Sequence, residues 1–156
     1  MRWLWASAGA VFLVDQASKF AVVHGLNLDQ RRAIDVWPPF LNFRMAWNEG
    51  VNFGLFASSQ SFMRWFLVAL ALAIATWVWL WLRRGHHTRL AHLGGGMLIG
   101  GALGNVVDRL LYGAVADFLN MSCCGIDNPY SFNIADIAIF AGALLLVVVS
   151  DRQKTP

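Results

Sequence analysis

Asp117 and Asp136 are the two residues whose type and position could do acid–base chemistry in an otherwise apolar chain. Asp117 follows the apolar run 90–111, and Asp136 lies just inside the run 134–150. If both runs cross a bilayer, the loop between them brings the two carboxyl groups to the same side and to a similar depth. An ionisable group at membrane depth is costly, and it is therefore a candidate functional residue by default.

Two carboxyl groups held close together cannot easily both ionise, so one keeps its proton while the other stays charged. A pair in that state can activate a water molecule and protonate a leaving amine. The two aspartates therefore predict an intramembrane hydrolytic site of the aspartyl type.

The composition indicates that membrane helices position these residues. Of the 156 residues, 58% are hydrophobic and 13% are charged, whereas a soluble domain has about 25% charged residues. A membrane span needs roughly 17–25 residues, and four apolar stretches qualify, at about 3–23, 63–82, 90–111 and 133–150. We therefore expect a mainly α membrane protein, a four-transmembrane-helix bundle that forms one domain over residues 1–156.

Asp15 and Lys19 lie inside the first apolar stretch, four residues apart and in the acid-then-base order that is favourable on a helix. We expect an internal salt bridge that tethers this helix. A direct chemical role is the less favoured alternative, because a close opposite charge holds the aspartate ionised. The stretch is also longer than the roughly 7–15 apolar residues of a cleaved signal peptide, so we expect it to be retained.

Lysine and arginine residues give the expected orientation. Six of the twelve lie at the chain ends and in the link between the second and third stretches, as Arg2, Arg83, Arg84, Arg89, Arg152 and Lys154. The link between the first two stretches also carries arginines, but acidic residues accompany them: Arg31, Arg32 and Arg44, with Asp29, Asp35 and Glu49. The positive-inside rule places that face in the cytoplasm, so both termini are expected inside and the aspartate pair near the outer face. The net charge of +3 does not indicate a nucleic-acid partner, because the basic residues flank membrane stretches instead of forming a stripe with interleaved aromatics.

Residues 26–61, between the first two stretches, are more polar and are predicted to lie outside the membrane. Residues 33–37 and 40–45 are predicted as short strands, since the second run alternates apolar and polar side chains. Residues 48–54 are typical of a turn-rich loop. We expect a small extracytoplasmic β-sheet and loop resting on the bundle.

The third stretch combines small residues with polar ones. Gly96, Gly100 and Gly104 share one helical face, a spacing that favours close helix packing. Asn105 and Arg109 also share a face near the outer end of this stretch.

For Arg109, which offers five fixed donors and keeps its charge, and for Asn105 we expect a role in positioning a substrate. Asp108 lies beside that face, and we expect it to form an Asp/Arg pair that fastens the bundle. Asn133 precedes Asp136 by three residues, so its amide is expected to cap a helix or hold the carboxyl group.

No cofactor or metal is expected. The four histidines have no ligand spacing, and Cys123 and Cys124 are adjacent, which is too close for an ordinary disulfide and gives no zinc site. The motifs of serine and metalloproteases, and the D-T/S-G and G-x-G-D motifs of other aspartic proteases, are absent from the sequence.

Five motifs in order resemble those of lipoprotein signal peptidase, also called signal peptidase II, and the resemblance covers nearly the whole chain. They are Asp15-Gln16-Ala17-Ser18-Lys19, Asn48-x-Gly50…Phe53-Gly54, Gly100-Gly101-Ala102-Leu103-Gly104-Asn105-x-x-Asp108-Arg109, Val115-x-Asp117-Phe118 and Phe132-Asn133-x-Ala135-Asp136.

The resemblance implies a bacterial inner-membrane aspartyl peptidase with four transmembrane helices. It implies that the enzyme removes the signal peptide of prolipoproteins just before the diacylglyceryl-modified cysteine, with Asp117 and Asp136 as the catalytic pair. The residues that it implies as support for the substrate or the dyad are Asn48, Gly50, Asn105, Arg109 and Asn133. The expected partners are lipidated prolipoproteins and membrane lipids, and we expect a monomer.

Two other classes of membrane protein share some of these features. A proton-coupled transporter also carries carboxylates in its helices, but this chain has no visible inverted repeat and its ionisable groups cluster at one face. A purely structural subunit would explain the glycines, but it would leave Asp117 and Asp136 without a purpose.

Overall fold

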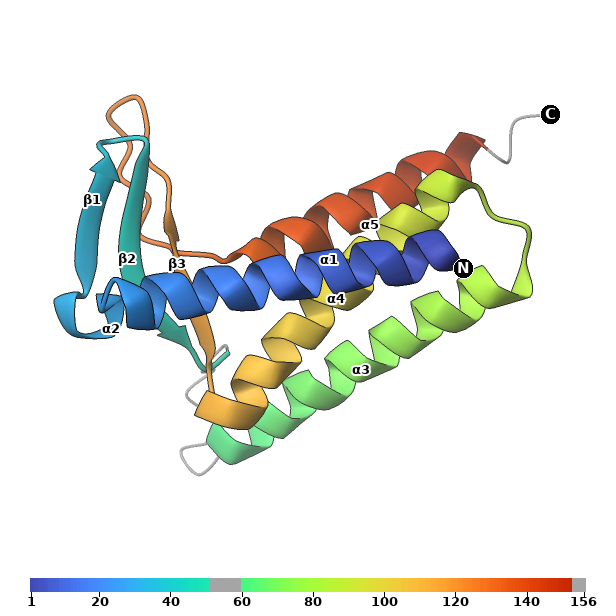
Figure 1. The fold of residues 1–156 in the computed structure, drawn as a ribbon, viewed down its shortest axis with the longest axis horizontal. Coiled ribbons are helices and arrows are strands. Elements are labelled where there is room, and N and C mark those ends of the chain that lie inside the picture. The colour runs from blue at the N-terminus through green and yellow to red at the C-terminus, as the bar shows by residue number, and fades with distance from the viewer. Residues whose placement is uncertain (51–59, 153–156) are drawn as a thin grey trace.

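Four long helices run back and forth in alternating directions, with a three-stranded sheet across one end of the bundle (Figure 1). The computed structural model describes residues 1–50 and 60–152, so residues 51–54 of the expected loop lie outside the described part. The helices are α1 (Arg2–Lys19), α2 (Leu28–Arg31), α3 (Gln60–Arg84), α4 (Arg89–Tyr112) and α5 (Ile134–Arg152). The strands are β1 (Ala33–Trp37), β2 (Leu41–Asn48) and β3 (Val115–Asn120).

Among the described residues, three helices are long and apolar enough to cross a membrane: Arg2–Gly25, Ser61–Arg84 and Arg89–Tyr112. The corresponding part of α5 is a shorter apolar helix, Ile134–Val149. The expected positions of all four helices agree with the structure within a few residues, whereas the count of four membrane spans stays a prediction.

Helix α4 lies at the centre of the bundle. Its glycines let the backbones of the neighbouring helices approach it closely. A Cβ atom on Gly100 would meet the backbone of Ala8 in α1, and one on Gly101 would lie 2.5 Å from the carbonyl oxygen of Ala135 in α5. A Cβ on Gly104 would lie 2.5 Å from the Asp15 carboxylate. The expected glycine face is therefore a packing face, as small residues in membrane helices commonly provide.

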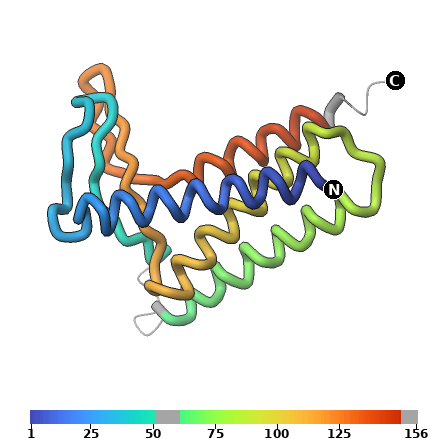
Figure 2. The backbone as a smooth tube through the Cα atoms, in the orientation of Figure 1, coloured from blue at the N-terminus to red at the C-terminus, as the bar shows by residue number. Residues whose placement is uncertain are grey.

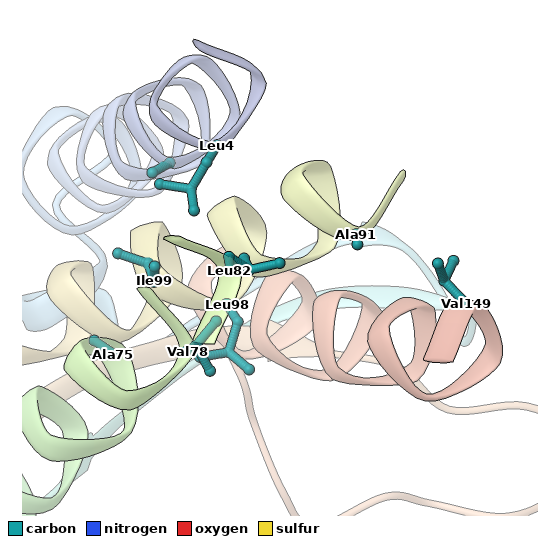
Figure 3. Packing of buried hydrophobic residues seen from close by; sticks show 9 residues of the cluster. Leu4, Ala75, Val78, Leu82, Ala91, Leu98, Ile99 and Val149 are labelled. Atoms are coloured by element: carbon teal, nitrogen blue, oxygen red, sulfur yellow. The ribbon is translucent and has the colours of Figure 1, made fainter. Parts of the chain in front are cut away.

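The apolar core lies where α1, α3 and α5 meet α4, and most of its side chains are drawn in Figure 3. Its buried members are Leu4, Ala8, Ala75, Val78, Leu82, Ala91, Leu98, Ile99 and Val149. This packing holds the four long helices together beside the polar residues near the sheet.

The sheet differs from the expected one in its third strand. Its order is β1-β2-β3, with both pairs antiparallel. The two strands expected within 26–61 are present, but β3 comes from the segment between α4 and α5, and it carries Asp117. Gly113 makes this turn possible, because it ends α4 in the left-handed conformation with φ of 83°.

A π-helical turn, Phe20–Gly25, extends α1 into the sheet. Its Val22 packs with Leu28 and Phe118 in a second apolar cluster that joins this turn, α2 and β3. The sheet is therefore anchored to α1 as well as to the ends of α4 and α5 (Figure 2).

Candidate active site

Asp117 lies in β3 and is almost completely buried, with 3% of its surface exposed. Two amides hold its carboxyl group. Asn48 Nδ2, at the end of β2, donates to Oδ2 at 3.0 Å, and Asn133 Nδ2 donates to Oδ1 at 2.6 Å. Asn48 reaches it because Ala46, two residues earlier, is paired with Asp117 across the sheet.

Asp136 lies in the first turn of α5, where it forms a reciprocal cap with Asn133. The Asp136 amide donates to Asn133 Oδ1 at 2.9 Å, and the Asn133 amide donates to Asp136 Oδ2 at 3.2 Å. This arrangement satisfies two of the backbone donors that a helix start leaves unpaired. Asn105 Nδ2 of α4 donates to the other carboxylate oxygen at 2.9 Å.

Asn133 joins the two carboxyl groups, because its side chain holds Asp117 while its backbone holds Asp136. The segment before α5 is in turn fixed to β3. The carbonyl oxygen of Phe132 accepts from the amides of Phe118 and Leu119, at 3.0 and 2.8 Å. These hydrogen bonds hold β3 against the start of α5. Strand β3 contributes Asp117 and α5 contributes Asp136.

Lys19 is the centre of a buried charge network next to this pair. Its Nζ lies 2.8 Å from Asp15 and 2.8 Å from Asp108, and it donates to Asn105 Oδ1 at 3.1 Å. The expected salt bridge between Asp15 and Lys19 is present. The prediction that Asp108 pairs with an arginine is wrong. Asp108 lies on the α1 side of α4 and pairs with Lys19, not with Arg109.

The charge network also holds the backbone that carries the two aspartates. Asp15 Oδ1 accepts from the Ala135 amide at 2.9 Å, and Asp108 Oδ2 accepts from the Ala116 amide at 3.2 Å. Ala135 and Ala116 each precede one of the two aspartates. Sequence reasoning missed Gln16, whose Nε2 bonds to both carboxylates of the network at 3.1 and 3.2 Å.

Arg109 lies within electrostatic range of Asp117 and Asp136. Its NH1 group donates to the Asn105 carbonyl within the same helix, at 3.3 Å. Its Nε is buried and has no hydrogen-bond partner in the part of the chain that the structure describes. This guanidinium therefore has one buried, unpaired donor and lies within electrostatic range of the two aspartates.

Gly50 shapes the chain beside Asn48. Its φ of 98° is left-handed, and its amide donates to Asn48 Oδ1 at 3.0 Å, which fixes the orientation of that side chain. A Cβ at this position would lie 2.7 Å from Leu67 of α3. Gly50 is therefore required by the backbone and by the close approach of α3.

The electrostatic setting of Asp117 favours its neutral form. Burial, and then the nearby charge of Asp136, raise the pKa of Asp117 from an ordinary value of 3.8 to about 6. The hydrogen bonds from Asn48 and Asn133 and the charge of Lys19 oppose this shift. Asp117 therefore keeps its proton to a higher pH than a solvated aspartate does.

The raised pKa of Asp117 predicts a pH dependence of folding stability. Because the folded pKa lies above the unfolded one, its stabilising contribution is present below pH 3.8 and is lost as the pH rises through 6. At about 1.4 kcal/mol per pKa unit, the loss amounts to about 3 kcal/mol. Unfolding of the wild type and Asp117→Asn in one detergent, from pH 4 to pH 8, measures it. We expect the steeper slope in the wild type, and parallel curves would contradict the shift.

Among the described residues, no group of three or more histidine, cysteine or acidic side chains could hold a metal ion. Cys123 and Cys124 are exposed free thiols in the loop after β3.

Comparison with known proteins decides the family. The family described as signal peptidase (SPase) II matches residues 7–151. The chain belongs to the signal peptidase II family. It is therefore a protease of the aspartic type, and the site residues named above all lie within the matched range.

Individual signal peptidase II relatives are similar over most of their length. A lipoprotein signal peptidase of Burkholderia mallei (strain SAVP1) is 39% identical over 145 residues, 93% of this chain and 84% of the relative. One of Methylorubrum extorquens (strain PA1) is 41% identical over 143 residues, 92% of this chain and 82% of the relative.

Two solved structures, each described as a bacterial membrane enzyme, share the fold of this signal peptidase II chain. One superposes with a TM-score of 0.76 at 25% sequence identity, covering 96% of this chain and 88% of that one. The other has a TM-score of 0.74 at 27% identity and covers 96% and 92%.

Proposed function

We propose that the protein is an intramembrane aspartyl endopeptidase that removes the signal peptide of diacylglyceryl-modified prolipoproteins, cutting just before the lipidated cysteine. The substrate class is supported by relatives named lipoprotein signal peptidase. The observation that carries the proposal is the joining of two carboxyl groups, Asp117 and Asp136, through the one residue Asn133.

In the proposed mechanism the two aspartates share one proton and activate a water molecule between them. Asp136, ionised, takes a proton from the water as its oxygen attacks the scissile carbonyl carbon. Asp117, whose pKa is raised, gives its proton to the leaving amine as the carbon–nitrogen bond breaks. The proton on Asp136 then returns to Asp117, which restores the pair.

Arg109 and Asn105 are proposed to position the substrate and the dyad. Arg109 offers five donors in a fixed fork, and this supports a hydrogen bond from its guanidinium to a substrate carbonyl. Asn105 donates to Asp136 and accepts from Lys19, which fixes the direction of its amide. Asp15, Lys19 and Asp108 are proposed to have a structural role in this assembly.

We infer a multi-pass protein of the bacterial inner membrane, with α5 as the fourth span and the dyad near the outer face. The start of α1 and the end of α5 both lie at the end of the bundle opposite the sheet (Figure 1). Arg83 and Arg84 end α3 at that same end of the bundle. By the positive-inside rule this end is cytoplasmic and the sheet is extracytoplasmic.

A lipidated precursor is expected to be cut at least about tenfold faster, in kcat/KM, than the same precursor without lipid. Acyl chains in the bilayer would hold the scissile bond at the depth of the dyad, and each buried methylene contributes about 0.8 kcal/mol. Two methylenes therefore already correspond to about a tenfold effect. The measurement is cleavage of the two precursors by purified protein in one detergent.

Equal kcat/KM values for the two precursors would show that the lipid does not set the register of cleavage. Cleavage at a peptide bond other than the one before the modified cysteine would contradict the proposed specificity. Mass spectrometry of the two products distinguishes these outcomes.

A further inference from the structure

The segment that connects β3 to α5, residues 121–133, ends in three residues that are each held by a different contact. Ser131 Oγ donates to the carbonyl oxygen of Arg44 in β2 at 2.8 Å. The Phe132 backbone pairs with β3 in an antiparallel bridge. Asn133 then contacts both aspartates of the dyad. The side chain of Ser131 is thus fixed to the sheet two residues before the residue that joins the two carboxyl groups.

The acceptor of the Ser131 hydroxyl lies in a β-bulge. Strand β2 places two residues, Arg44 and Met45, opposite the single residue Phe118 of β3. A bulge bends a strand locally and changes the direction of the groups on it. The Arg44 carbonyl oxygen at this bend accepts the hydroxyl. Because β2 also pairs with Asp117, the segment before α5 is tied to the strand that holds one of the two aspartates.

A buried asparagine holds the connecting segment against β3 just before Ser131. Asn120 ends β3 and is 7% exposed. Its Nδ2 donates to the carbonyl oxygens of Asn128 and Tyr130, at 2.7 and 2.9 Å, which uses both hydrogens of the amide. Asn128 Oδ1 in turn accepts from the Tyr130 amide at 3.0 Å. The backbone that leads into Ser131 is therefore fixed from one side by β3 and from the other by β2.

The contacts of Asn133 depend on the position of its backbone. Its Nδ2 lies 2.6 Å from Asp117 Oδ1, and its amide nitrogen lies 3.2 Å from Asp136 Oδ2. A shift of this backbone would alter both contacts at once, because the side chain and the amide belong to one residue. A displacement of about 1 Å at a reacting group can cost about a hundredfold in rate. The position of Asn133 therefore bears directly on the geometry of the dyad.

We propose that Ser131 is a positioning residue, whose hydroxyl bond to β2 holds Asn133 in contact with both aspartates. The effect reaches the dyad through Asn133. The inference rests on the proposed aspartyl mechanism, because the carboxyl pair is the part of the site whose geometry it concerns. Among the contacts of residues 131–133, that of Ser131 can be removed by a side-chain change that leaves the backbone pairing and the groups on the carboxylates in place.

Kinetics of Ser131 variants with a lipidated prolipoprotein test the proposal. Ser131→Ala is expected to lower kcat about threefold to tenfold, the effect of one net hydrogen bond, with KM within about twofold of the wild type. Ser131→Thr keeps the hydroxyl and suits extended backbone, so its kcat is expected to stay within about twofold. Ser131→Val has the shape of threonine without the hydroxyl, and it is expected to behave like Ser131→Ala.

Ser7→Ala is the matched control. The Ser7 hydroxyl also bonds to backbone carbonyls, those of Leu4 and Leu93, each at 3.1 Å. It lies in the first half of α1, which begins at the end of the bundle opposite the sheet (Figure 1). The control is expected to lose stability to a similar extent as Ser131→Ala but to keep kcat within about twofold. Equal losses of kcat in the two variants would overturn the proposal, because they would show a general effect of stability.

A second measurement does not need cleavage. The carboxyl carbons of protein labelled with carbon-13 aspartate are titrated by NMR in detergent, and Asp117→Asn identifies the Asp117 signal. Burial and then the charge of Asp136 raise the pKa of Asp117, whereas the hydrogen bonds from Asn48 and Asn133 lower it. The charged groups within range of this carboxyl group are Asp136, Lys19 and Arg109.

A weaker bond from Asn133 is expected to move the titration of Asp117 to higher pH in Ser131→Ala and Ser131→Val. Ser131→Thr and Ser7→Ala are expected to titrate like the wild type. An unchanged titration in both hydroxyl-free variants of Ser131 would overturn the proposal. So would a kcat of Ser131→Thr as low as that of Ser131→Val. Because the titration does not involve cleavage, its outcome is separate from that of the proposed peptidase activity.

Discussion

Asp117→Asn or Asp136→Asn is expected to lower cleavage of a lipidated prolipoprotein at least about a thousandfold while leaving the bundle folded. Asparagine keeps the shape of the side chain but cannot cycle a proton, and general acid–base steps contribute about 10²–10⁴-fold each. The measurement is kcat/KM of the purified variants, with size-exclusion chromatography and circular dichroism as the test of folding. Asp29→Asn, which removes an exposed carboxylate outside the site, serves as the control and is expected to retain full activity.

Near-normal cleavage by either variant would contradict the dyad. A chelator is expected to have no effect on the wild type, because the carboxyl pair and its amides are proposed to supply the chemistry. Loss of activity in EDTA that zinc restores would argue for a metal mechanism instead.

Lys19→Met is expected to destabilise the protein by about 3–5 kcal/mol, the usual effect of removing one partner from a buried ion pair. The variant would leave two buried carboxylates, Asp15 and Asp108, without their cation. Asp15→Asn is expected to destabilise the protein less than Lys19→Met does, because Lys19 would keep Asp108 as a partner. Thermal unfolding in detergent and the yield of monodisperse protein measure both effects.

A Lys19→Met variant that unfolds like the wild type but cleaves slowly would contradict the structural role. It would indicate instead that Lys19 acts on the reaction through Asn105, which also donates to Asp136.

The helices and the buried ion pair could be predicted because their signals are local. Apolar length fixed the helix positions, and the four-residue spacing of Asp15 and Lys19 predicted the contact that the structure has at 2.8 Å. The same spacing put Asn105 and Arg109 on one face. Asp108 was assigned the wrong partner, because spacing along one helix cannot tell which neighbouring helix its carboxylate meets.

Strand β3 could not be predicted, because tertiary pairing creates it. The run Val115–Asn120 is apolar on both sides of Asp117 and does not alternate, since the strand is buried on both faces. Its partner β2 lies far away in the sequence. The hydrogen bond from the Ala135 amide to Asp15 is also invisible in sequence, because a backbone donor carries no residue signature.

The glycine contacts of α4 divide the bundle into a stiff part and a compliant part. Helices α1 and α5 touch α4 backbone to backbone, at Ala8 and Ala135, where no rotamer can give way. Helix α3 instead meets α4 through flexible ends of side chains, with Leu82 against Gly95. If the proposed substrate reaches the dyad sideways from the lipid, the helix with the more adaptable contacts is the one expected to move. We therefore expect α3 to move away from α4 when the substrate enters. Helices α1, α4 and α5 are expected to keep the two aspartates in the same relative position.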